Sequence, residues 1–369
     1  MPRIIVSTTN DISTDNRVHK VCMVLMDLGY ELLWVGRELP NSKPLERPYR
    51  TKRFKLWFNK GALFYANYNL RLLFFLVSKK FDVLLSNDLD SLLANYLAAK
   101  LKRKPLVYDT HEYFLGVPEI QENWLAKTVW TKIERWIFPK LKHVFTVNQS
   151  IANLYKEDYG NQLMVFRNIS MPPEIDVWES RAELGLPEEK FIFINQGSGI
   201  NVDRGMEEAL NAIAQLDNAV LLLVGSGDVI PDLKEQVAKQ NLSSKVIFVD
   251  RVPYQKLLQY THAADVGITL DKDTNINYKY SLPNKLFDYI YCGIPVLASR
   301  VIEVRKIVED YKIGRIAESH EIPELVNKMR LMMEDGKEIY YAQLEQAAKE
   351  LSWENEKNAV VDFYRTFLN

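Results

Sequence analysis

The feature that most constrains the fold of this chain is an alternation of short apolar strands with helical segments, which runs through the sequence twice. The first series has apolar strand-length segments at 4–7, 31–35, 83–85, 106–109 and 143–147. The second series has them at 191–195, 220–224, 246–249, 266–270 and 296–298. Strands that alternate with helices indicate parallel sheets covered by helices. A composition shift at 167–174 separates the two series and predicts a linker between two α/β domains.

Length and composition agree with two domains and exclude several classes of protein. The 369 residues exceed what one hydrophobic core usually supports. A net charge of −1 argues against nucleic-acid binding. Cys22 and Cys292 lie far apart and outside any CxxC spacing, so neither a disulfide framework nor a zinc site is indicated. With no signal-peptide pattern at the N-terminus and no run of ~20 apolar residues, we expect a cytoplasmic protein.

The segment 281–295 combines a tight turn, a helix and a second tight turn around one cation and one carboxylate. The unpaired backbone N–H groups of the first helical turn suit a phosphate, and Lys285 adds a full positive charge. Asp288, one helical turn further on, can accept two hydroxyl hydrogen bonds, as from a ribose. An ordinary strand–helix–strand connection explains the same letters equally well. The residues expected to form the binding turn are Ser281, Pro283 and Asn284.

This segment resembles the donor-binding signature of the retaining glycosyltransferases of family 4. Those enzymes have the GT-B architecture, in which two Rossmann-like domains with parallel sheets face each other across a cleft. The resemblance implies that the segment binds a nucleoside diphosphate sugar and that Asp288 holds the ribose. Members with two glutamates eight positions apart would have the first at the position of Tyr280. The hydroxyls of the donor sugar are therefore expected to be held differently here.

The loop 196–205 follows the first strand of the second series and precedes a helix. Its glycines allow the backbone to approach a phosphate closely, and Arg204 can hold phosphate oxygens bidentately. The loop resembles the first donor loop of the family, in which a basic residue before a glycine stabilises the departing diphosphate. Ser198 stands where the family often has a second arginine, so Lys285 is expected to compensate. The donor contacts expected from this loop are Gly197, Gly199 and Asn201.

Two further turns of the second series resemble donor-binding elements. Gly225 and Ser226 belong to a turn similar to the Val-Gly-x-Gly turn of the family, although a simple strand-ending turn explains them equally. Arg251 and Val252 occupy the stretch that usually lines the nucleotide base. The resemblance therefore implies that these four residues contact the donor.

In the first series, His111 follows a strand end and is flanked by Asp109 and Glu112. A lone histidine is usually structural, but this position faces the expected cleft. The motif resembles the Asp-x-His-Glu of family 4, in which the histidine lies against the donor sugar. We therefore expect His111 to contact the substrate.

Two basic, aromatic stretches lie in the first half, at 51–80 and 124–142. The first holds seven cations and eight aromatic residues without an acid. Helices of this composition lie on anionic membrane surfaces, with cations toward the headgroups and aromatic rings at the interface. The alternative is an internal helix with aromatic core residues and solvated lysines. The membrane interpretation predicts a peripheral protein on the inner face of the cytoplasmic membrane.

Together these features predict an α/β protein of GT-B architecture, with an acceptor-side domain (1–167, joined by a helix at 353–369) and a nucleotide-sugar domain (168–352). The predicted activity is sugar transfer, with retention, from a nucleoside diphosphate sugar to a glycan or lipid-linked acceptor. The expected catalytic residues are His111, Arg204 and Lys285, without a metal or other cofactor. A nucleotide-sugar 2-epimerase of the same fold and a catalytically silent nucleotide-sugar-binding protein remain as alternatives.

Overall fold

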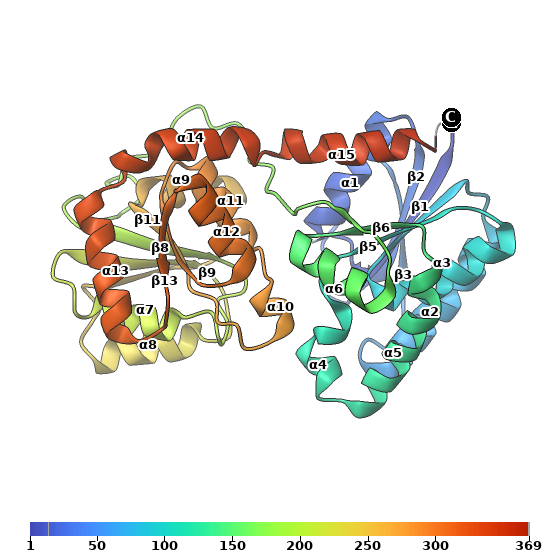
Figure 1. Cartoon of the computed structure of the whole chain (residues 1–369), viewed down its shortest axis with the longest axis horizontal. Coiled ribbons are helices and arrows are strands. Elements are labelled where there is room, and N and C mark those ends of the chain that lie inside the picture. The colour runs from blue at the N-terminus through green and yellow to red at the C-terminus, as the bar shows by residue number, and fades with distance from the viewer. Residues whose placement is uncertain (14, 368–369) are drawn as a thin grey trace. The chain divides into compact units, whose positions relative to one another are not determined.

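A computed structural model, which describes residues 1–13 and 15–367, separates into two compact units. Unit 1 comprises Met1–Asn168 together with the described chain from Glu354 onward, and unit 2 comprises Ile169–Trp353. Each unit is built on one parallel sheet with helices on its faces (Figure 1). The expectation of two Rossmann-like α/β domains with parallel sheets is thus confirmed.

Unit 1 contains a parallel sheet with the strand order β3-β2-β1-β4-β5-β6-β7. Its strands are β1 (Arg3–Asp11), β2 (Glu31–Glu38), β3 (Arg50–Lys55), β4 (Val83–Asn87), β5 (Leu106–Thr110), β6 (His143–Thr146) and β7 (Met164–Val165). Its helices are α1 (Asn16–Asp27), α2 (Gly61–Ser78), α3 (Leu89–Lys102), α4 (Pro118–Gln121), α5 (Trp124–Ile137), α6 (Gln149–Tyr159) and α15 (Trp353–Arg365). The basic stretch 51–80, expected as a helix, is divided, because its first residues pair with β2 as strand β3.

Unit 2 contains a parallel sheet with the strand order β10-β9-β8-β11-β12-β13. Its strands are β8 (Phe191–Gly197), β9 (Ala219–Gly225), β10 (Val246–Val249), β11 (Val266–Thr269), β12 (Val296–Ser299) and β13 (Gly314–Ala317). Its helices are α7 (Met206–Ile213), α8 (Ile230–Lys239), α9 (Tyr254–Ala263), α10 (Ile276–Lys279), α11 (Asn284–Tyr291), α12 (Ile302–Tyr311), α13 (Ile322–Asp335) and α14 (Tyr341–Glu350). The chain order reverses between β8 and β11, and ligands of open parallel sheets bind at the carboxyl ends of strands beside such a reversal.

Helix α15 joins unit 1 although it lies at the other end of the sequence. In Figure 1 its red ribbon runs beside the blue helix α1. The buried carboxylate of Glu356 accepts hydrogen bonds from the backbone N–H and the guanidinium of Arg167, and the Tyr30 hydroxyl donates to the carbonyl oxygen of Tyr364 at 2.8 Å. The ring of Phe363 lies edge-on to that of Phe145, with centroids 4.8 Å apart. The C-terminal helix therefore completes the core of the N-terminal sheet.

Helix α11 lies close against the sheet of unit 2 because β11 carries a glycine beneath it. A Cβ atom on Gly267 would lie 2.4 Å from the ring of Tyr289. The fully buried Tyr289 places its hydroxyl 3.2 Å from the carbonyl oxygen of Ile194 and 3.1 Å from that of Ile268. This contact sets the distance between the N-terminal turn of α11 and the carboxyl ends of β8 and β11.

Replacing Gly267 by alanine is expected to lower the free energy of unfolding by roughly 1–3 kcal/mol, because the added methyl group overlaps a ring that cannot move without losing its hydrogen bonds. Denaturant titration measures the change. Gly199→Ala is the control, since a Cβ atom there meets nothing within 4 Å. Equal stability of the Gly267→Ala and Gly199→Ala proteins would contradict the close approach of α11.

Candidate active site

The two glycine-containing loops at the carboxyl ends of β8 and β9 are bonded to each other. Gly197 pairs with Gly225 in the strand ladder, and both have φ of +133°. The Ser226 N–H donates to the carbonyl oxygen of Gly197 at 3.0 Å, and the Asp228 N–H donates to the side chain of Asn201. A Cβ atom on Gly225 would lie 1.9 Å from the Gly197 oxygen. The loop residues predicted to contact the donor therefore lie together. The Ser226 N–H is already engaged, whereas the space around Gly199 is open.

Arg204, in the loop between β8 and α7, is held by a carboxylate that we did not predict as part of the site. Its guanidinium forms an ion pair of 2.5 Å with Asp271, two residues after the end of β11. The same guanidinium lies over the ring of Tyr278, 4.1 Å from the centroid. Its Nε is buried without a hydrogen-bond partner among the described residues. The arginine is thus fixed in place while one of its N–H donors is unused.

Lys285 lies in the first turn of α11 and is half-buried. No hydrogen bond or ion pair to its ammonium group is found among the described residues. Burial lowers the pKa of this ammonium; the nearby Asp271 carboxylate raises it, and the Arg204 cation lowers it again. The hydroxyl of Ser281, in the turn before the helix, is also buried without a partner in the described chain. Unpaired buried donors of this kind commonly mark a site for water or a ligand.

Asp288, the predicted ribose contact, is only 5% exposed and is engaged on both oxygens. The Gln196 amide donates to one oxygen at 2.9 Å, and the Tyr254 hydroxyl donates to the other at 2.8 Å. These two bonds fix the orientation of the carboxylate. The ribose role of Asp288 stays a prediction.

The other predicted donor residues surround the same edge of the sheet. Pro283 precedes α11 and Asn284 is its exposed first residue. Arg251 is exposed in the loop after β10, and Val252 packs partly against the core of unit 2. Tyr280 ends the short helix α10.

In unit 1, His111 lies in a cluster of alternating charges at the carboxyl ends of β4 and β5. Its Nδ1 lies 3.1 Å from Asp88 and its Nε2 lies 3.6 Å from Asp109. Asp109 also accepts two bonds from the buried guanidinium of Arg17, at 2.8 and 3.2 Å. Although burial opposes its charge, the two carboxylates raise the pKa of His111 well above its ordinary value. The structure thus places His111 between two carboxylates that favour its charged form, and its contact with substrate stays a prediction.

Asp88 is a second residue that the sequence interpretation missed. Its φ is +56° and its ψ is 163°, a conformation nearly restricted to glycine. One carboxylate oxygen accepts the backbone N–H of His111 at 2.9 Å. Asp88 and Asp271 share a signal that could have revealed them, since each is an acid within two residues of the end of a buried strand.

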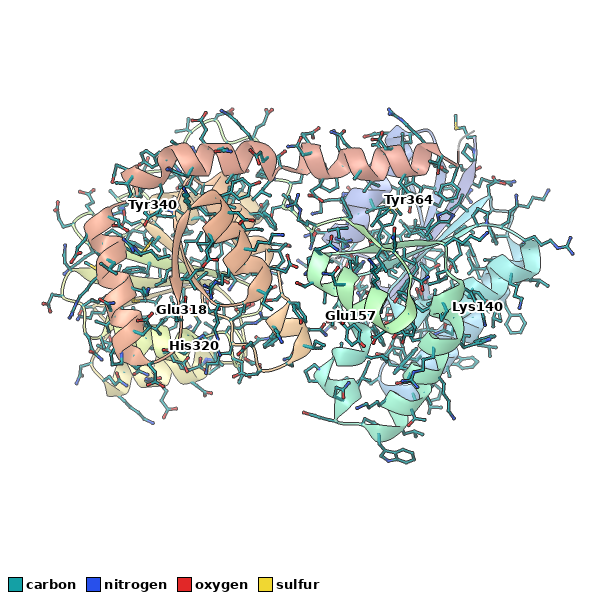
Figure 2. All side chains as sticks on the ribbon, in the orientation of Figure 1. Lys140, Glu157, Glu318, His320, Tyr340 and Tyr364 are labelled. Atoms are coloured by element: carbon teal, nitrogen blue, oxygen red, sulfur yellow. The ribbon has the colours of Figure 1, made fainter. Side chains whose placement is uncertain are left out.

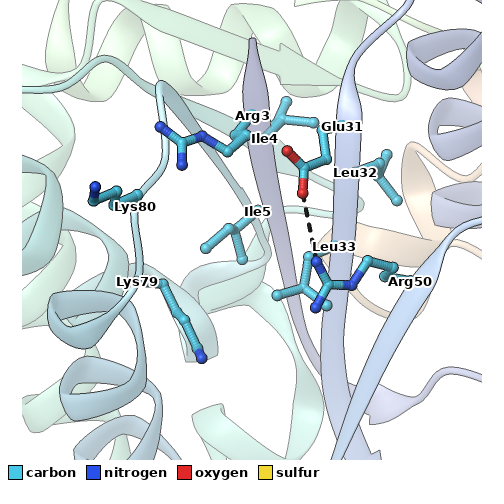
Figure 3. Close-up of a pocket in the computed structure, with 9 residues that line it drawn as sticks. All are labelled: Arg3, Ile4, Ile5, Glu31, Leu32, Leu33, Arg50, Lys79 and Lys80. Carbon is cyan, nitrogen blue, oxygen red and sulfur yellow. Dashed lines mark hydrogen bonds and ion pairs between the residues drawn. The ribbon is translucent and has the colours of Figure 1, made fainter. Parts of the chain in front are cut away.

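No group of three or more His, Cys, Asp or Glu side chains suited to hold a metal ion is found among the described residues. A hollow of about 250 Å³ lies at the start of β1 and β2, lined by Arg3, Glu31, Arg50, Lys79 and other residues (Figure 3). Arg50 there pairs with Glu31 at 3.4 Å. Because donor loops follow the carboxyl ends of the strands, this hollow is not part of the candidate site.

The two basic, aromatic stretches contribute both core and surface. Phe64 and Tyr68 of α2 are buried, as the alternative of an internal helix required. Trp57 is 78% exposed and Trp124 is 76% exposed. The stretches meet where Tyr65 lies edge-on to Trp130, with ring centroids 5.1 Å apart. No helix in the described chain is both long and apolar enough to cross a bilayer.

Comparison with known structures supports the fold. Sucrose-phosphate synthase from Thermosynechococcus elongatus is 18% identical, with a TM-score of 0.79, over 100% of this chain and 99% of that chain. HepE from Anabaena, solved in complex with UDP and glucose, is 16% identical, with a TM-score of 0.72, over 100% and 99%. WaaG, a glycosyltransferase involved in lipopolysaccharide biosynthesis, is 13% identical, with a TM-score of 0.67, over 98% and 99%. At these identities the likeness shows the GT-B fold alone.

Two family models match adjoining parts of the sequence. The model of glycosyl transferases group 1 matches residues 176–351, and the model of glycosyltransferase family 4 matches residues 15–168. A comparison with curated protein sequences finds no match. The two matches cover most of the chain, divide it near the boundary between the two units, and name the same kind of enzyme. Each half of the chain is therefore similar to a glycosyltransferase family, and the chain has the GT-B fold.

Proposed function

We propose that the protein transfers a sugar from a nucleoside diphosphate sugar to a glycan or lipid-linked acceptor, with retention of the anomeric configuration. The observation that carries the donor assignment is a pair of neighbouring cations, Lys285 in the first turn of α11 and Arg204 in the loop between β8 and α7. Lys285 is half-buried with no hydrogen-bonding or ion-pairing partner found in the described chain, and Arg204 has a buried, unused N–H donor. A diphosphate supplies the anionic oxygens that both groups lack.

The chemistry of transfer explains why these cations are needed. The bond between the anomeric carbon and a diphosphate oxygen breaks, and the acceptor oxygen forms a bond to that carbon while its proton leaves. Negative charge then accumulates on the departing diphosphate. Arg204, Lys285 and the free N–H groups of α11 stabilise that charge, because they are already oriented before the reaction starts. We propose that they do so without a metal ion.

The nucleoside is proposed to lie toward β9 and β10, with Asp288 on the ribose and Arg251 and Val252 beside the base. Asp288 supports this role because Gln196 and Tyr254 fix its carboxylate in one orientation. HepE binds UDP and glucose, and a further HepE structure contains UDP-glucose. Uridine diphosphate sugars are therefore the first donors to test. His111 is proposed to act toward the sugar as a fixed positive charge.

Retention is proposed from the resemblance of 281–295 to family 4 enzymes. The epimerase alternative is not favoured, because the similar structures described above include a named glycosyltransferase. A silent binding protein differs from both in a simple way, since it binds donors without consuming them.

Membrane docking is proposed for the face of unit 1 formed by exposed residues of 57–80 and 124–142. Its exposed aromatic and aliphatic side chains include Trp57, Leu63, Phe74, Trp124 and Leu125. Arg71 lies over the ring of Trp57, 4.6 Å from the centroid, so cation and ring share this face. Positive charge beside exposed aromatic rings fits an anionic lipid surface.

The function is tested by incubating the protein with radiolabelled UDP-, GDP- and CDP-sugars, with and without lipid-linked acceptors. We expect acceptor-dependent release of the nucleoside diphosphate, and a product whose anomeric configuration, read by NMR, matches that of the donor.

Arg204→Ala should lower kcat by 10²–10³-fold, about 3–4 kcal/mol, with a smaller change in KM, because it acts mainly in the transition state. Arg315→Ala is the control, since Arg315 forms an equivalent pair with Asp335 elsewhere in unit 2. An unchanged kcat for Arg204→Ala would contradict the proposal that Arg204 stabilises the departing diphosphate.

The ribose contact is tested with Asp288→Asn, which keeps the shape of the side chain and removes its charge. Loss of a charged hydrogen bond should weaken binding of UDP, GDP or CDP about tenfold or more. The matching 2′,3′-dideoxy nucleotides should bind wild type and variant equally, because they lack the ribose hydroxyls. Isothermal titration calorimetry measures both. Equal losses for the two kinds of nucleotide would show that Asp288 only supports the fold.

Membrane docking is tested by co-sedimentation with vesicles of phosphatidylglycerol and phosphatidylcholine. Wild type should sediment at low salt and progressively less as salt rises, because screening weakens an attraction of about 1 kcal/mol per cation. Replacing Trp57, Phe74 and Trp124 together by serine should abolish sedimentation. The control replaces Val177, Ile339 and Tyr341, three exposed apolar residues of unit 2. Failure of wild type to sediment at low salt would exclude this surface as a lipid-binding face.

A further inference from the structure

A hollow of about 130 Å³ lies in unit 2 beside the proposed diphosphate site. It is lined by the residues that follow three neighbouring strands, Asp271 and Asp273 after β11, Arg300 and Val301 after β12, and Glu318, Ser319 and His320 after β13. Figure 2 labels Glu318 and His320 at this edge of the sheet. At about 30 Å³ for each water, the hollow has room for roughly four water molecules.

Asp271 is the buried charged group of this hollow, at 2% exposure. Its Oδ2 is paired with Arg204. Its Oδ1 is buried and has no hydrogen-bond partner among the described residues. A buried carboxylate oxygen without a donor is costly, so a group that donates a hydrogen bond is expected there.

The same carboxylate is unfavourable for a site that binds only a diphosphate. Asp271 is near enough to influence the ionisation of Lys285 and is bonded to Arg204, the two cations proposed to hold the phosphates. A negative charge at this position weakens the attraction of both cations for an anion. The presence of Asp271 is explained if the donor carries, besides its diphosphate, a group that needs a hydrogen-bond acceptor.

The strand order indicates which part of the donor that group belongs to. The proposed nucleoside contacts lie at β8, β9 and β10, and the cations lie where β8 and β11 adjoin. The hollow lies on the other side of the cations, at β11, β12 and β13. A molecule with its nucleoside on one side and its diphosphate in the middle therefore places its sugar at the hollow.

We propose that Asp271 accepts a hydrogen bond from a hydroxyl group of the transferred sugar, and that the hollow beside it is the sugar subsite. Sugar hydroxyls are neutral donors, which suit the unpaired Oδ1. His320 lies next to it with a fixed ring, because its Nε2 bonds to the carbonyl oxygen of Leu270 at 2.8 Å. The subsite therefore suits a sugar whose hydroxyl groups donate hydrogen bonds. This inference rests on the proposed function.

The test is Asp271→Asn, which preserves volume and removes the charge. The dissociation constants of UDP-, GDP- and CDP-sugars and of the matching free diphosphates are measured by calorimetry for the full-length protein. In wild type, at least one nucleotide sugar should bind more tightly than its diphosphate. In the variant the ratio of the dissociation constant of the diphosphate to that of the nucleotide sugar should fall about tenfold. The free diphosphate itself should bind equally or more tightly, because a repelling charge is gone.

Weaker binding of the nucleotide sugar together with equal or tighter binding of the free diphosphate would separate sugar recognition by Asp271 from a structural role. Equal weakening of both ligands would mean that Asp271 only positions Arg204, and an unchanged sugar advantage would mean that the sugar lies elsewhere; either result overturns the inference. It is also overturned if no nucleotide sugar exceeds its diphosphate in wild type. Asp335→Asn, which breaks the corresponding pair with Arg315, should alter neither ligand. Absence of any diphosphate binding would instead contradict the proposed function itself.

Discussion

The approach of α11 to the sheet of unit 2 is the contact on which the proposed donor site depends. The Tyr289 hydroxyl reaches backbone oxygens of both β8 and β11, and Gly267 leaves the space that its ring occupies. The helix that carries Lys285 and Asp288 is thereby fixed against the two strands whose ends carry the glycine loop and Asp271. Sub-ångström placement of a cation against a diphosphate needs such a rigid support, because stabilising groups act best when no reorganisation is required.

Both units concentrate charge at the carboxyl ends of their strands, but they balance it differently. In unit 1 the charges alternate through Arg17, Asp109, His111 and Asp88. Both carboxylates accept hydrogen bonds there, whereas the Nε2 of His111 is buried without a hydrogen-bond partner among the described residues. In unit 2 the Nε of Arg204 and the Oδ1 of Asp271 are buried without such partners in the described chain. Unit 2 therefore leaves both a donor and an acceptor that a ligand could bind.

Much of the fold could be predicted because its signals are local. Apolar runs marked β8, β9 and β12, and Gly293 with Pro295 marked the end of α11. Strands β3, β7 and β13 were missed because they are short or largely polar and are defined by pairing with a neighbour. The segment 281–295, which carries Lys285, was singled out by its turn chemistry. Asp271 was not, since its pairing with Arg204 joins residues 67 positions apart. Likewise, nothing local in the letters around Asp88 predicts its positive φ or its bond to His111.

Helix α15 makes unit 1 discontinuous in sequence, and this affects the order in which the protein can mature on the ribosome. Chains emerge N-terminus first, and domains fold as they become complete. All residues of unit 2 are synthesised before Glu356, Phe363 and Tyr364 are available to cover Arg167, Phe145 and Tyr30. The domain that is translated first is therefore finished last. A chain that stops short of its final helix contains a complete unit 2 beside a unit 1 whose aromatic core is still open to solvent.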